Sequence, residues 1–172
     1  MRSWSESALK PEIIELLEEI GYDQPTPIQR QAIPISLQNR DVIGIAETGS
    51  GKTAAFLLPL VQWLSGLDAA KRNEGWDEGP FAIIMAPTRE LAMQICEESD
   101  KFGKKFDITS ITVIGGQDKG DQGFRLQQGV DIVVGTPGRL LDMLESRYRG
   151  FGNVLKFNFT IILKMNKMAR FF

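Results

Sequence analysis

The sequence predicts an α/β protein whose mainly parallel sheet is covered by helices on both faces. Short apolar runs alternate along the chain with longer segments of helical periodicity. The runs are nearly continuous in apolar residues, which is typical of strands buried on both faces. Glycine, proline and threonine residues follow several runs, at the positions where parallel sheets bind their ligands. With 172 residues, the chain fits one domain comfortably.

The first predicted elements are a helix, a strand and a second helix. Segment 9–22, LKPEIIELLEEIGY, places its apolar residues on one helical face, and Gly21 ends the helix. Segment 41–46, DVIGIA, indicates a buried strand. A helix is expected from Lys52 to about Leu64 in spite of Pro59. Segment 68–79 is polar and contains glycine, so we expect a surface loop there.

The rest of the chain alternates strand and helix. The expected strands are FAIIMAP (81–87), ITSITVIGG (108–116), DIVVGTP (131–137) and FNFTIIL (157–163). The expected helices are 88–102, opened by Thr88 as its N-cap, a short helix at 121–129 and another at 138–147. This order is typical of a parallel sheet of five strands with crossover helices.

Composition excludes several classes of chemistry. The chain contains no histidine, which removes histidine-dependent triads and most zinc enzymes. Its single cysteine, Cys96, excludes an internal disulfide and fits a reducing compartment. No stretch approaches 18 apolar residues, so we expect a soluble intracellular protein. The formal net charge of −2 does not itself indicate a nucleic-acid partner, which must be argued from local residues.

Segment 46–53, AETGSGKT, indicates a site for nucleotide phosphates. The general phosphate-loop pattern is G-x-x-x-x-G-K-[ST], and here Ala46 takes the first position. The glycines let backbone N–H groups turn towards phosphate oxygens, and the helix that follows directs its positive end at them. The alternative is a glycine-rich turn that happens to carry a lysine. The candidate residues are Ala46, Glu47, Thr48, Gly49, Ser50, Gly51, Lys52 and Thr53.

A second candidate segment, GYDQPTPIQRQAIP (21–34), lies upstream of the phosphate loop. Gln29 precedes Lys52 by 23 residues, and a glutamine amide can donate and accept at once, as the edge of adenine requires. Tyr22 offers a ring for base stacking, which contributes about 1–3 kcal/mol. Taken alone, the segment could equally be a proline-rich turn with a core tyrosine.

Together with PTRELA (87–92), GG (115–116) and TPGR (136–139), these motifs resemble the DEAD-box RNA helicases. The resemblance covers about Arg2 to Leu163. The flanking segments look most like the nuclear branch of the family that acts in pre-mRNA splicing at the 5′ splice site. The resemblance implies the first RecA-like domain of a P-loop NTPase over residues 1–163, a three-layer sandwich whose sheet ends after the fifth strand. It also implies a nuclear location, with the cytoplasm as alternative, and contacts with spliceosomal proteins.

The resemblance also implies roles for individual residues. Gln29 and Tyr22 would recognise the adenine of ATP, residues 46–53 would hold its phosphates, and Thr53 would bind Mg²⁺ with the nucleotide. A second set would hold the backbone of single-stranded or duplex RNA. Arginine guanidinium groups can donate two parallel hydrogen bonds to a phosphate, and glycines let the RNA backbone approach the protein closely. Such contacts do not read bases, so we expect RNA binding that is independent of RNA sequence. The residues of this set are Pro87, Thr88, Arg89, Gly115, Gly116, Thr136, Pro137, Gly138 and Arg139.

The sequence departs from the family where the acidic D-E-A-D motif is expected. Lys164, Met165, Asn166 and Lys167 stand in that position, and no acidic residue follows Glu145. In the family, one carboxylate holds Mg²⁺ through water and another orients the attacking water. We therefore expect no catalytic residues here, with hydrolysis slower by roughly a thousandfold or more. Residues 164–172 would be a divergent basic tail, from an altered chain end or as an RNA-binding patch, and no second RecA-like domain is expected.

Three functions therefore remain open. The chain is the ATP- and RNA-binding lobe of a helicase, a stand-alone module that binds nucleotide and RNA without turnover, or an unrelated phosphate-loop enzyme such as a small kinase. The Gln29 segment and PTRELA count against the kinase. The family motifs favour the helicase, and the missing carboxylates favour the non-hydrolysing module.

Overall fold

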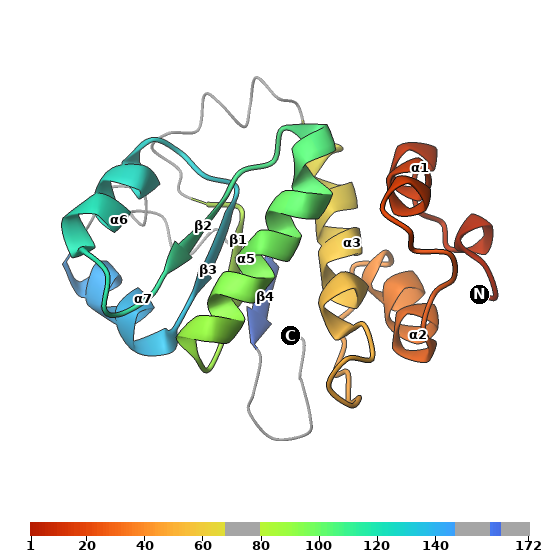
Figure 1. The fold of residues 1–172 in the computed structure, drawn as a ribbon, viewed down its shortest axis with the longest axis horizontal. Coiled ribbons are helices and arrows are strands. Elements are labelled where there is room, and N and C mark those ends of the chain that lie inside the picture. Colours follow the sequence, from red (N-terminus) through yellow and green to blue (C-terminus); the bar gives the residue numbers. More distant parts are fainter. Residues whose placement is uncertain (68–79, 147–158, 163–172) are drawn as a thin grey trace.

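The fold is a four-stranded parallel sheet between two layers of helices (Figure 1). It is seen in a computed structural model that describes residues 1–67, 80–146 and 159–162. The expected loop at 68–79 and the expected tail at 164–172 lie outside the described residues. The strands are β1 (Ala82–Met85), β2 (Ser110–Val113), β3 (Ile132–Gly135) and β4 (Phe159–Ile162), in the order β2-β3-β1-β4. The predicted parallel α/β class is thus confirmed.

Alternate residues of the strands face opposite layers. Ile84 and Val134, which are paired across β1 and β3, belong to a large core with α3 (Lys52–Leu64) and α5 (Arg89–Gly103). Ile83 and Val133 belong to a smaller core with α6 (Lys119–Gln127) and α7 (Pro137–Glu145). Because both faces are covered, the strands carry the unbroken apolar runs that the sequence shows. Thr88 caps α5 as predicted, its Oγ1 accepting from Leu91 N at 3.3 Å.

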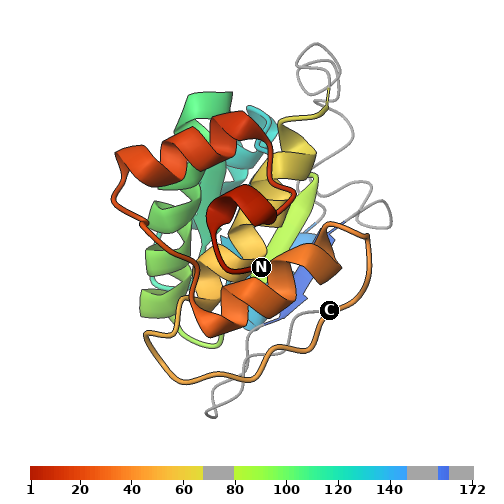
Figure 2. The ribbon, with the colours of Figure 1, turned by 90° about the vertical axis from the view of Figure 1, so that its right-hand side faces the viewer.

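The N-terminal segment forms a further layer against α3. It contains the short 3₁₀ helix η1 (Trp4–Glu6), α1 (Pro11–Glu19) and α2 (Pro27–Ser36), and Figure 2 shows η1 between α1 and α2. Gly21 has φ +78°, so the left-handed turn after α1 agrees with the predicted helix stop. A second 3₁₀ helix, η2 (Lys104–Phe106), follows α5. Helix α2 was not predicted. Three prolines, Pro25, Pro27 and Pro34, lie in or beside it, and a segment so rich in proline favours a turn.

The prediction of a strand at 41–46 is wrong. In the described part of the chain this segment pairs with no strand, and Ile43 and Ile45 are each 57% exposed. An apolar run becomes a strand only when a neighbour supplies ladder hydrogen bonds, and the described ladder ends at β4. The sheet consequently has four described strands instead of five.

None of the described helices combines the length and apolar character needed to span a bilayer.

Candidate functional site

The phosphate-loop segment is a tight turn at the start of α3, at the sheet edge where the strands end (Figure 1). Gly49 and Gly51 have φ +81° and +86°, a backbone region that favours glycine. The carbonyl of Glu47 accepts from Ser50 N at 3.3 Å and from Ser50 Oγ at 2.7 Å. The predicted residues therefore form one compact loop whose last glycine is the N-cap of the helix.

Lys52 lies folded into this loop. Its Nζ donates to the carbonyl of Ala46 at 2.7 Å and also to that of Glu47. Partial removal from water lowers the pKa of Lys52, while the charge of Glu47 opposes the shift. The ammonium group is thus bound by loop carbonyls and lies among the backbone groups that would surround a phosphate.

Gln29 connects α2 to the phosphate loop. Its side chain is 1% exposed. Its Oε1 accepts from Thr26 N at 2.8 Å, and its Nε2 donates to the carbonyl of Gly51 at 3.1 Å. A Cβ on Gly51 would come within 2.5 Å of that Nε2, so the approach requires glycine. The predicted adenine residue therefore also fixes the phosphate loop, and its amide retains a second N–H.

Tyr22 is half-buried against the C-terminal half of α5. Its ring meets Phe102 edge-on with centroids 5.8 Å apart, and Lys101 Nζ lies 5.1 Å from its centroid. Its hydroxyl donates to Glu98 Oε2 at 3.5 Å, and burial together with the Glu98 charge raises the pKa of Tyr22. Trp4, a residue that the sequence analysis did not select, donates from Nε1 to the Tyr22 carbonyl at 2.6 Å.

The phosphate loop fits the phosphates of a nucleotide but not a protein-built metal site. The left-handed glycines, the lysine and the N-terminus of a 13-residue helix supply the donors that phosphate oxygens need. Thr53 supplies one hydroxyl. Across residues 1–67 and 80–146, no three acidic, cysteine or histidine side chains gather as ligands for a metal ion. A metal ion in this site would therefore have to arrive with the nucleotide.

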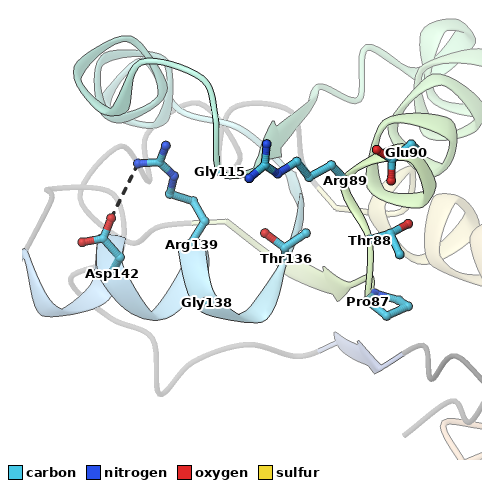
Figure 3. A pocket seen from close by; sticks show the side chains of 9 residues that line it. All are labelled: Pro87, Thr88, Arg89, Glu90, Gly115, Thr136, Gly138, Arg139 and Asp142. Atoms are coloured by element: carbon cyan, nitrogen blue, oxygen red, sulfur yellow. Dashed lines mark ion pairs between the residues drawn. The ribbon is translucent and has the colours of Figure 1, made fainter.

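Most of the second set of predicted residues come together around an open groove of about 670 Å³, although Gly116 and Pro137 do not line it (Figure 3). The groove lies across the ends of β1, β2 and β3, where α5 and α7 begin. Its lining residues are Pro87, Thr88, Arg89, Glu90, Gly115, Thr136, Gly138, Arg139 and Asp142. Seven of these nine were predicted from the sequence. Two acids, Glu90 and Asp142, were not.

Arg89 is the exposed cation of this groove. Its guanidinium covers the backbone of the β2–α6 loop, and a Cβ on Gly116 would come within 2.4 Å of its Nη1. Gly116 also has φ +84°. The backbone conformation at this position favours glycine, whereas the exposed Arg89 side chain could move away from an added Cβ.

Arg139 is directed into the protein and its side chain is only 15% exposed. Its Nε donates to the carbonyl of Ile114 at 3.1 Å, and its Nη2 donates to the carbonyl of Gln117 at 2.7 Å. Arg139 thus holds the β2–α6 loop from α7, and the Arg89 guanidinium lies close to the same loop from α5 (Figure 3). The fork-shaped donors expected for RNA phosphates are partly engaged by the chain itself.

Asp142 pairs with two cations at the end of the groove. Its Oδ1 is 2.5 Å from Lys119 Nζ, and its Oδ2 is 3.6 Å from Arg139 Nη1. The hydrogen bond from Lys119 is the main cause of a lowered pKa for Asp142. The spacing of Arg139 and Asp142, i and i+3 on a helix, is a signal that could have identified the pair.

Residues 26–162 match the family model of the DEAD/DEAH box helicases. The human "Probable ATP-dependent RNA helicase DDX23" is 62% identical over 148 residues, which are 86% of this chain and 18% of that protein. The Neurospora crassa "Pre-mRNA-splicing ATP-dependent RNA helicase prp-28" is 51% identical over 147 residues, 86% of this chain and 20% of that protein.

A solved structure has the same fold. The crystal structure of the RNA helicase Prp28 from Chaetomium thermophilum bound to ADP matches with a TM-score of 0.84 and 44% sequence identity. The match covers 97% of this chain and 39% of the other. The chain spans about a fifth of the length of the curated relatives named above.

Proposed function

Because the chain belongs to the DEAD/DEAH box helicase family, we propose that it is the ATP- and RNA-backbone-binding lobe of an RNA helicase. The observation that carries this proposal is the placement of a phosphate loop and a groove with two arginines at one edge of a parallel sheet. Ligands of open parallel sheets bind at this edge. The name of the Neurospora crassa relative further supports a role in pre-mRNA splicing. With that role we propose a nuclear location and contacts with spliceosomal proteins.

In this proposal, the loop at residues 46–53 binds the phosphates of ATP. Lys52 exchanges the carbonyls of Ala46 and Glu47 for phosphate oxygens, and Thr53 contributes a hydroxyl to Mg²⁺ held by the nucleotide. Bound magnesium would neutralise charge on the phosphates. Gln29 and Tyr22 read the adenine, and the contact from Gln29 to Gly51 joins base recognition to the phosphate loop.

The groove would bind the RNA backbone. Arg89 supplies the exposed guanidinium, and the N-termini of α5 and α7 direct positive partial charge towards it. Contacts of this kind read phosphate and sugar, so binding should be independent of sequence.

A second candidate is a module that binds nucleotide and RNA without hydrolysis. The observation that favours it is the sequence KMNK at 164–167, where the family has acidic residues, and the family match ends at residue 162. A chain of this kind would bind ADP and ATP yet release no phosphate. Phosphate release by the full chain with saturating RNA would contradict this second candidate.

We expect the full chain to bind ADP at least about tenfold more tightly than GDP, since hydrogen bonds to a base edge give about 1–3 kcal/mol of discrimination. Titration of both nucleotides by calorimetry measures the ratio. Gln29→Ala should bring the ratio close to one, whereas Gln24→Ala, at an exposed position five residues earlier, should leave it unchanged. Equal affinities in the unmutated chain would remove the basis for adenine recognition.

Gly138→Ala tests whether RNA approaches the start of α7. A Cβ at Gly138 meets nothing within 4 Å, so stability should stay the same or rise by up to about 1 kcal/mol. If the RNA backbone lies against this turn, the methyl group should weaken binding of an oligouridylate by roughly fivefold through lost contacts. Fluorescence anisotropy measures this affinity, and an unchanged value would place the backbone elsewhere in the groove.

A further inference from the structure

The groove carries as much negative as positive formal charge. Its lining residues include two arginines, Arg89 and Arg139, and two carboxylates, Glu90 and Asp142. A surface that binds polyphosphate backbones gains affinity from every uncompensated cation. A carboxylate in such a groove therefore opposes the binding that the arginines favour.

Asp142 is placed to compensate two cations at once. It contacts Lys119 Nζ at 2.5 Å and Arg139 Nη1 at 3.6 Å, and its side chain is 49% exposed. Lys119 also donates to Ser146 Oγ at 2.6 Å, so the ammonium group is drawn along α7 and away from the ends of the strands. Figure 3 shows the carboxylate beside the Arg139 guanidinium, which reaches towards the β2–α6 loop.

Arg139 does not depend on Asp142 for its position. Two carbonyls, those of Ile114 and Gln117, already accept from its Nε and Nη2. The Asp142 contact is longer than either of these bonds and is made to the remaining nitrogen, Nη1. Removing the negative charge should leave the guanidinium in place.

We propose that Asp142 sets the affinity of the groove for RNA, by withholding the charges of Lys119 and Arg139 from the bound backbone. This inference rests on the proposed function. A carboxylate in this position weakens binding, and its replacement by a neutral amide strengthens it. Because Asp142 offsets positive charge in the groove, RNA is released faster, and a helicase requires such release in each cycle.

Asp142→Asn in the full chain tests this role. The amide oxygen of asparagine can still accept from Lys119, so local geometry is preserved. We expect the variant to bind an oligouridylate about fivefold more tightly at about 50 mM salt, with a salt slope steeper by roughly 0.7, the value for one additional cation on a single strand. The gain should shrink as salt screens the freed charge.

Two further variants make the result specific. Glu145→Gln removes the same charge from the next turn of α7, at an exposed residue outside the groove lining. It should raise affinity less than twofold, a fraction of the Asp142→Asn effect, since Glu145 does not line the groove that would hold the RNA backbone. Lys119→Gln combined with Asp142→Asn should lose part of the gain, because the double variant has the same net charge beside the groove as the unmutated chain.

The outcomes separate this inference from the proposed function. Weaker RNA binding by Asp142→Asn with unchanged thermal stability, or an equal gain in Glu145→Gln, would overturn the role of Asp142. RNA binding by the unmutated chain that is unaffected by Arg89→Gln would instead show that the groove is not the RNA site. In that case the proposed RNA-binding function of the groove would be wrong, independently of the role of Asp142.

Discussion

Lys52→Ala should abolish measurable binding of ADP to this chain. The lysine supplies the only ammonium group within the phosphate loop, and charge-assisted hydrogen bonds to phosphate are among the strongest that a protein makes. We expect affinity to fall by about a hundredfold or more, since such bonds contribute about 1.5–3 kcal/mol each. Calorimetric titration with ADP measures the loss.

The fold should survive this substitution. Among the residues that the structure describes, Lys52 donates only to the carbonyls of Ala46 and Glu47, and water can replace the ammonium group at a partly exposed loop. Lys104→Ala, at an exposed position after α5, removes the same charge and should leave ADP affinity unchanged. Unchanged ADP affinity in Lys52→Ala would contradict the interpretation of residues 46–53 as a phosphate site.

Gly135→Ala should give a large loss of stability. Gly135 is the last residue of β3, and a Cβ there would come within 2.7 Å of both Leu140 Cγ and the carbonyl oxygen of Val113. The carbonyl belongs to the neighbouring strand and Leu140 is buried in the core under α7, so neither can move cheaply. Overpacking of this kind costs about 1–3 kcal/mol, and we expect the upper end of that range.

Thermal unfolding followed by circular dichroism measures the effect, which should be a lower midpoint by roughly 5–10 °C for a chain of this size. Gly138→Ala, three residues later, is the matched control because open space surrounds its added methyl group. If both variants unfolded at the midpoint of the unmutated chain, the close packing of α7 on the sheet described above would be incorrect.

Much of the fold could be predicted from the chain, because local patterns and tertiary packing agree. The bounds expected for α3, Lys52 to about Leu64, match the structure, since an apolar helix after a glycine turn needs little further information. The strands β1 to β4 each lie within a predicted apolar run. Segment 41–46 is an apolar run like those of the strands, but it forms no strand, because a strand also requires a neighbouring strand to pair with. Helix α2 was missed because Pro27 and Pro34 indicate a turn, whereas Pro27 in fact occupies the first helical turn.

The site shows the same division. The sequence determined which residues gather at the ends of the strands, because spacing after each apolar run places them at one edge of a parallel sheet. Only the tertiary structure decided how those residues are engaged: Gln29 bonds to Gly51, Lys52 to loop carbonyls, and Arg139 to the β2–α6 loop. It also introduced Asp142 beside Lys119 from another helix. Periodicity and motifs depend on neighbours along the chain, whereas hydrogen bonds and charge compensation depend on atoms that come together only when distant segments pack.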